Sequence, residues 1–135
     1  MTQLAPGATV TVAHTVAETD LASSLSSEDS FPPVFATSRM VALMEVAASR
    51  TMASDLAEGE LSVGVSVDVT HSAATPPGAT VRATAHFVGV EGKLYVFEVV
   101  AEDDGGEIGR GIHRRAVVHA DRLLAGAKRR VGGGQ

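Results

Sequence analysis

A single helical repeat of apolar residues constrains this chain most, because the other patterned segments alternate as strands do. From about Ser38, apolar side chains recur at the i, i+3, i+4 and i+7 spacing of a helix with one buried face. This face carries Met40, Leu43, Met44, Ala47, Ala48, Thr51 and Met52. Thr37 or Ser38 is expected to cap the helix, and Gly59 lies just beyond its expected end near Leu56. The chain thus offers one long helix to cover its core.

Apolar and polar residues alternate both before and after this helix, as in strands with one buried face. Strands are expected over residues 7–16, 62–71, 81–87, 95–99 and 107–120, separated by turn-forming residues at 73–78, 91–92 and 103–106. The valines at the odd positions 63–69 are expected to share the buried face. This order predicts an α+β protein with an antiparallel sheet and the helix lying across it. One helix leaves sheet edges and apolar surface uncovered, so a homodimer is expected.

Length and composition restrict the possible organisation and partners. The 135 residues fit one domain, 1–135, with a lid-like loop at 17–34, a short helix beginning near Leu123 and Leu124, and a flexible tail at 129–135. The absence of cysteine excludes a Cys-ligated zinc site or a Cys nucleophile and fits a cytoplasmic protein. A formal charge of −5 argues against nucleic acid as a partner. No apolar run reaches eighteen residues, so no membrane partner is predicted.

Glu45 is the most informative polar residue of the helical stretch. Its helical neighbours Val41, Ala42, Ala48 and Met52 place it on the shoulder of the apolar face. A carboxylate in that position is partly desolvated, which favours general-base chemistry. The alternative is a boundary side chain that reaches water or pairs with an arginine.

Two further candidates stand at the ends of predicted elements. His71 ends its strand on the odd-numbered face, where it could orient a carboxylate or donate to a developing charge; otherwise it is a hydrogen-bonded boundary histidine. Thr37 stands at the helix start, where free N–H groups stabilise an oxyanion and a hydroxyl serves as nucleophile or proton relay. Its simpler role is that of an N-cap. The sequence does not show whether Glu45 meets His71.

Other patterns predict no additional site. His113 and His119 share a strand face but lack a third ligand at useful spacing, so no metal is expected. The basic run 128–130 is expected to be solvated, or to contact the phosphates of a nucleotide ligand. The glycine-rich run 105–109 does not precede a helix, which excludes a dinucleotide-binding fingerprint.

Three blocks of sequence together form a recognisable pattern. The first combines FPPVFAT at 31–37 with MVALME at 40–45, and the second is VTHSAATPPG at 69–78. The third combines VEG at 90–92, EIG at 107–109 and the residues His113, Arg115, Ala116 and Val117. At this spacing the three blocks resemble fluoroacetyl-CoA thioesterases, and the similarity covers roughly residues 31–120. It implies the hot-dog fold, in which an antiparallel sheet wraps around one long central helix, and a homodimer.

The resemblance implies a catalytic trio and three substrate-binding residues, namely Thr37, Glu45 and His71, and Phe31, Gly64 and Arg115. It implies that Phe31 is a gate over the acyl pocket. It also implies that Gly64 and Arg115 take part in polar recognition of the acyl group. The implied substrate is a short-chain acyl-CoA, with fluoroacetyl-CoA among the candidates. Coenzyme A would be part of that substrate, and no cofactor is implied.

The chain departs from the family pattern in the lid-like loop and at the helix start. Leu25 is the one large apolar side chain in the segment 23–30, and Glu28 falls where a lid aromatic aligns. Ser38 and Arg39 replace a small residue followed by an aromatic. A polar lid is expected to close less tightly over the acyl group, so a broader range of short acyl groups is predicted.

The sequence therefore predicts an acyl-CoA thioesterase that uses a Thr/Glu/His trio. A non-hydrolytic acyl-CoA-binding module and a hot-dog dehydratase stay open as alternatives, because one scaffold hosts several chemistries. Thiol release from a thioester would identify a hydrolase, and alkene formation would identify a dehydratase.

Overall fold

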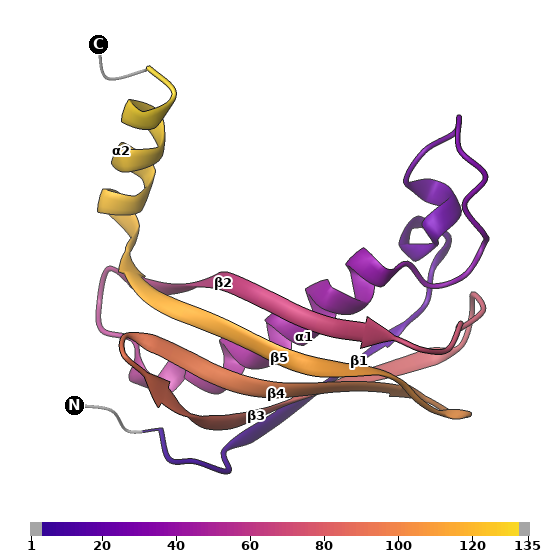
Figure 1. The fold of residues 1–135 in the computed structure, drawn as a ribbon, viewed down its shortest axis with the longest axis horizontal. Helices are drawn as coiled ribbons and strands as arrows, with labels where there is room; N and C mark the ends of the chain where they lie inside the picture. Colours follow the sequence, from indigo (N-terminus) through magenta and orange to yellow (C-terminus); the bar gives the residue numbers. More distant parts are fainter. Residues whose placement is uncertain (1–3, 133–135) are drawn as a thin grey trace.

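The computed structural model describes residues 4–132 and consists of one curved antiparallel sheet with a long helix packed against it (Figure 1). The strands and helices are β1 (Thr9–Thr15), α1 (Thr37–Met52), β2 (Glu60–His71), β3 (Thr80–Glu91), β4 (Leu94–Asp103), β5 (Gly106–His119) and α2 (Ala120–Arg130). Short 3₁₀ turns at Glu18–Asp20, Ala22–Ser24 and Ala53–Asp55 complete the chain. The sheet order is β1-β3-β4-β5-β2. The predicted α+β architecture is confirmed.

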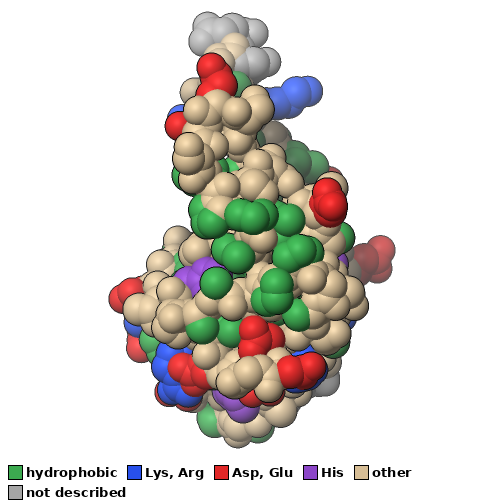
Figure 2. All heavy atoms as spheres, turned by 90° about the vertical axis from the view of Figure 1, so that its right-hand side faces the viewer, with side chains coloured by type: hydrophobic (Ala, Val, Ile, Leu, Met, Phe, Trp, Pro, Cys, Tyr) green, Lys and Arg blue, Asp and Glu red, His purple; other side chains and the backbone are tan. Residues whose placement is uncertain are grey.

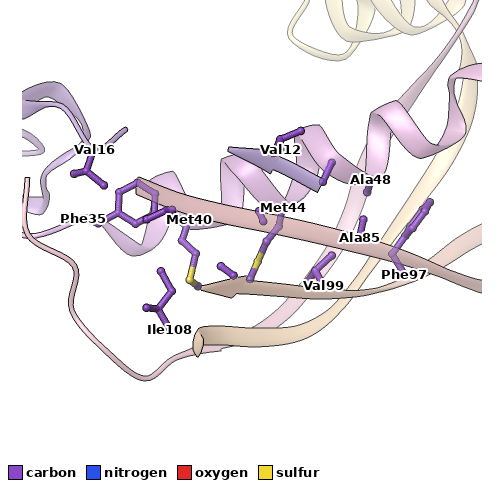
Figure 3. Close-up of a cluster of buried hydrophobic side chains, with 14 of the residues drawn as sticks. Val12, Val16, Phe35, Met40, Met44, Ala48, Ala85, Phe97, Val99 and Ile108 are labelled. Carbon is purple, nitrogen blue, oxygen red and sulfur yellow. The ribbon is translucent and has the colours of Figure 1, made fainter. Parts of the chain in front are cut away.

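The core forms between α1 and the concave side of the sheet (Figure 3). The predicted helical face is buried at Met40, Met44, Ala47, Ala48, Thr51 and Met52. Opposite it, β3 buries its alternate residues Val81, Ala83, Ala85 and Phe87. Each fully buried large apolar side chain stabilises the fold by about 1.5–3 kcal/mol. This shared burial fixes α1 along the sheet.

Close packing beneath α1 requires a glycine in β5. A Cβ atom at Gly109 would lie 2.7 Å from the Met40 Sδ and 2.6 Å from the Thr70 carbonyl oxygen. Both distances are shorter than real Cβ contacts allow, and the Thr70 oxygen is fixed in the β2–β5 pairing. Gly109 therefore lets the start of α1 approach the sheet closely.

A β-bulge interrupts β2 at Val65. Gly64 lies opposite Arg115, and the next pairing joins Ser66 to Arg114, so Val65 is an extra residue. Val65 is 53% exposed. An inserted residue shifts the alternation of side chains by one position. Odd-numbered residues before the bulge therefore point to one side of the sheet, and odd-numbered residues after it point to the other. The expectation that all odd-numbered valines of this strand share one buried face is therefore wrong.

The lid-like segment and α2 lie at opposite ends of the molecule (Figure 1). α2 projects from the end of β5 and continues through Arg130, two residues into the segment expected to be a tail. Residues 133–135 lie outside the described residues. Within residues 4–132, no helix is both long enough and apolar enough to cross a bilayer.

Candidate active site

Thr37 and His71 meet at the N-terminal end of α1. The Thr37 Oγ1 lies 2.8 Å from the His71 Nδ1. Thr37 is the first residue of α1, and His71 is the last residue of β2. The N-cap of this helix is Ala36, which has no side-chain capping bond, so the prediction that Thr37 or Ser38 caps the helix is wrong. The Thr37 hydroxyl is instead committed to the histidine.

The surroundings of His71 favour an uncharged ring. Burial lowers its pKa below the ordinary 6.5, and the backbone of Ala73 opposes this only in part. Its buried Nε2 makes no hydrogen bond within the described part of the chain. A ring with its proton on Nδ1 avoids a buried unpaired N–H group and donates to the Thr37 Oγ1. The hydroxyl proton of Thr37 is then free to donate to a substrate oxygen.

A pocket of about 340 Å³ opens beside this pair. Pro32, Val34 and Phe35 from the lid side line it together with Thr37 and His71. Figure 2 views the molecule from this end and shows hydrophobic side chains gathered there. Such a lining suits a small acyl group beside a hydrogen-bond donor.

Phe31, the expected gate, lies on the lid-like segment and is 45% exposed. It directly precedes Pro32, but it does not itself line the pocket beside Thr37. The structure thus places Phe31 near the predicted site without closing it over the cavity.

Glu45 belongs to a second polar cluster, centred on Arg115. The buried Arg115 guanidinium donates to the Glu45 Oε1 at 3.2 Å and to the His113 Nε2 at 3.1 Å. It also donates to the Ser62 Oγ and the Ser62 carbonyl, both at 3.0 Å. The Glu45 side chain remains 41% exposed and lines a cavity of about 420 Å³. The carboxylate is therefore oriented by a fixed cation and still open to solvent.

Gly64 makes room for this carboxylate. A Cβ atom at Gly64 would collide with the Glu45 Oε1 and would lie 3.2 Å from the His113 Cε1. The bulge at Val65 makes Gly64 face α1. In a strand without the bulge, in which the odd-numbered residues face the helix, Gly64 would face the opposite side of the sheet. Gly64 thus belongs to the Glu45 cluster through the space it leaves.

His113 belongs to the Glu45 cluster, whereas its place in the sequence indicated only the family pattern and a rejected metal site. Its ring is 1% exposed, and its Nδ1 donates to the Ser66 carbonyl at 2.9 Å. Burial lowers its pKa, which keeps Nε2 unprotonated as an acceptor for Arg115. A signal existed in the sequence, because His113 and Arg115 are two residues apart and so share one face of β5.

Within this chain the predicted trio is divided between two places. Thr37 contacts His71, whereas Glu45 contacts Arg115 and lies beside Gly64. Glu45 follows Thr37 by eight residues on α1, which corresponds to about 12 Å along the helix axis. Among residues 4–132, no three His, Asp or Glu side chains cluster closely enough to hold a metal ion.

Comparison with known proteins identifies the family of the chain. Residues 16–121 match the model of the fluoroacetyl-CoA-specific thioesterase family. The chain belongs to the fluoroacetyl-CoA-specific thioesterase family. Its similarity to the fluoroacetyl-CoA thioesterase of Streptantibioticus cattleyicolor is 48% identity over 104 residues, which are 77% of this chain and 75% of that protein. The resemblance of the three sequence blocks to this family is confirmed.

Solved structures of this family, and of the wider thioesterase superfamily, have the same fold. A variant of the fluoroacetyl-CoA thioesterase FlK in complex with fluoroacetate superposes with a TM-score of 0.88 and 41% identity, covering 93% of this chain and 98% of that one. Another FlK variant, in complex with fluoroacetate and CoA, gives 0.83 and 42%, covering 88% and 98%. A thioesterase superfamily member from Thermus thermophilus gives 0.87 and 27%, covering 96% and 94%. The predicted hot-dog fold is confirmed.

Proposed function

We propose that this protein is an acyl-CoA thioesterase that hydrolyses short-chain acyl-CoA, including fluoroacetyl-CoA, to the free acid and CoA. The observation that carries the proposal is the Thr37–His71 pair at the start of α1, beside a pocket with both polar and apolar lining. Similarity to the fluoroacetyl-CoA thioesterase of Streptantibioticus cattleyicolor supports the substrate class. We further propose that the chain forms a single domain in which residues 17–34 are the lid. We also propose that the protein is cytoplasmic.

The proposed chemistry divides the work between two polar groups. The Thr37 hydroxyl and the free N–H groups of the first turn of α1 hold the thioester carbonyl oxygen and stabilise the oxyanion. Glu45, oriented by Arg115, takes a proton from the water that attacks the carbonyl carbon. His71 keeps the Thr37 hydroxyl in place. Collapse of the tetrahedral intermediate then breaks the C–S bond, and the proton held by Glu45 passes to the departing sulfur, so that free acid and CoA leave and the carboxylate is regenerated.

We infer a homodimer because this chemistry needs both groups at one carbonyl. A general base and an oxyanion donor must each lie about 3 Å from reacting atoms, which the spacing of Thr37 and Glu45 along one helix does not allow. A second copy supplies the missing group if the Glu45 of one protomer faces the Thr37 of the other. The outer edge of β2 pairs with no other strand of residues 4–132 and exposes Val65 and Val67, which favours it as the contact.

Mixing two inactive variants tests this shared site. Light scattering should give twice the chain mass for Thr37→Ala and for Glu45→Gln, each nearly inactive alone. After subunit exchange between equal amounts of the two variants, about a quarter of the parent activity should return, because half of the dimers are mixed and each mixed dimer has one intact site of two. A mixture that stays inactive although exchange is demonstrated would place all three residues of each site in one protomer.

A panel of substrates tests both the reaction class and the lid. Thiol release should be observed with acetyl-, fluoroacetyl- and propionyl-CoA, whereas binding without release or alkene formation would indicate the alternative functions. Because the lid segment 23–30 is polar, the ratio of kcat/KM for fluoroacetyl-CoA over acetyl-CoA should be lower than that of the Streptantibioticus cattleyicolor enzyme measured side by side. An equal ratio would show that the polar lid has no effect on selectivity.

A further inference from the structure

A buried carboxylate connects three elements outside the proposed catalytic groups. The Asp20 carboxylate, in the lid-like segment, is only 3% exposed. Its Oδ1 accepts the Nε and Nη2 of Arg39 in α1, at 3.1 and 2.9 Å. Its Oδ2 lies 2.6 Å from the Nε2 of His14 in β1 and accepts the backbone N–H of Ala17 at 2.8 Å. Each oxygen of this carboxylate therefore has two hydrogen-bonding partners.

The same residue lies where the two arms of the lid meet. The Ala36 N–H donates to the Asp20 carbonyl at 2.9 Å, and Leu21 and Phe35 form an isolated antiparallel bridge. One step further out, the Ala22 N–H donates to the Val34 carbonyl at 2.8 Å. The two arms are thus held to each other at a neck. Asp20 joins this neck to both β1 and α1.

The pKa of Asp20 determines the charge of this carboxylate. Burial by itself would raise the pKa of Asp20, but hydrogen bonds from Ala17, His14 and Arg39 together lower it to about 2. The carboxylate is therefore ionised throughout the neutral range. Two nitrogens of Arg39 donate to the same oxygen of this carboxylate, Oδ1, and these charge-assisted hydrogen bonds are stronger than neutral ones.

We propose that Asp20, Arg39 and His14 form an anchor that holds the neck of the lid against the first turn of α1. Arg39 lies two residues after Thr37, so the anchor fixes the lid to the same turn that presents the Thr37 hydroxyl. Arg39 and Asp20 are then positioning residues for acyl-CoA hydrolysis, and this part rests on the proposed function. The contact between the lid neck and α1 is an ion pair, formed by Arg39 of α1 and the buried Asp20 carboxylate.

Substitution of Arg39 tests the anchor with two independent measurements. Arg39→Met keeps the aliphatic stem but removes both hydrogen bonds to Asp20, and Arg39→Lys retains the charge. Arg82→Met is the matched control, because Arg82 pairs with Asp104 on the exposed rim far from the lid in sequence. Hydrogen exchange of peptides spanning 17–36 reports the anchor without requiring activity, and kcat and KM for acetyl-CoA report positioning.

For Arg39→Met we expect faster exchange confined to 17–36, a raised KM and a loss of about tenfold in kcat/KM, because small misplacements of reacting groups slow catalysis strongly. Arg39→Lys should recover part of both effects, and Arg82→Met should show neither. Unchanged exchange over 17–36 in Arg39→Met would overturn the anchor. Faster exchange with unchanged kcat and KM would overturn the positioning role. If the parent protein releases no thiol from any acyl-CoA, the proposed function fails, while the exchange data still decide the anchor.

Discussion

Replacing Glu45 by glutamine should lower kcat on the best acyl-CoA substrate by about 10²-fold or more, the loss typical of removing a general base. Glutamine keeps the size of the side chain and an oxygen that accepts from Arg115, so the geometry around Gly64 is preserved. Only the basicity of the group is removed. KM should change little, because the side chain lies beside the attacking water and not along the CoA moiety in the proposed mechanism.

Thermal unfolding and a second carboxylate control this experiment. The melting temperature of Glu45→Gln should stay near that of the parent, since the side chain is 41% exposed. Glu107→Gln removes another ion-paired carboxylate, that of the Glu107–Arg110 pair on β5, and should leave kcat unchanged. If Glu45→Gln has the kcat of the parent protein, Glu45 is not a general base but a boundary residue that pairs with an arginine.

Replacing Thr37 by alanine should also lower kcat by about 10²-fold, because it removes a hydrogen bond to the developing oxyanion. The His71 Nδ1 then loses its hydroxyl partner but keeps its place at the end of β2. The fold should tolerate the change, since Thr37 is exposed and does not cap α1. Steady-state kinetics with acetyl-CoA and fluoroacetyl-CoA should show the loss in kcat for both substrates.

Thr37→Ser separates the hydroxyl from the methyl group of this side chain. Serine restores the donor, so its kcat should lie much closer to the parent value than that of Thr37→Ala. If Thr37→Ser and Thr37→Ala reduce kcat equally, the loss comes from the methyl group and the hydroxyl has no role. In that case His71→Ala should be as active as the parent protein. Together these two results would contradict a catalytic role for the Thr37–His71 pair.

The sequence predicted the architecture because each helix or strand shows the spacing of apolar residues that is typical of its type. The helical face containing Met40 and Met44 and the alternation of Val81, Ala83 and Ala85 are determined by which side of an element meets the core. The sharp turns at 91–92 and 103–106 were equally readable, since Gly92 and Gly106 take positive φ. These features depend on neighbours in the chain, which a sequence displays directly.

The site was only partly predictable because it depends on contacts between distant segments. Resemblance named Thr37, Glu45 and His71, but the sequence did not show that Thr37 would meet His71 while Glu45 would meet Arg115. One inserted residue at Val65 changes which side of β2 faces the helix, and alternation alone gives no warning of it. Polar partners that lie far apart in the chain leave no periodic signal.

The buried methionines of α1 affect how the protein responds to oxidation. The chain has no cysteine and four methionines, and Met40, Met44 and Met52 are at most 1% exposed against the sheet. A thioether is readily converted to a polar sulfoxide, which a close-packed core does not accommodate. Because these three sulfur atoms are buried, we expect oxidants to reach them mainly when α1 lifts from the sheet. Sulfoxide at these positions therefore records how often the protein has opened, and each event makes reclosure less favourable.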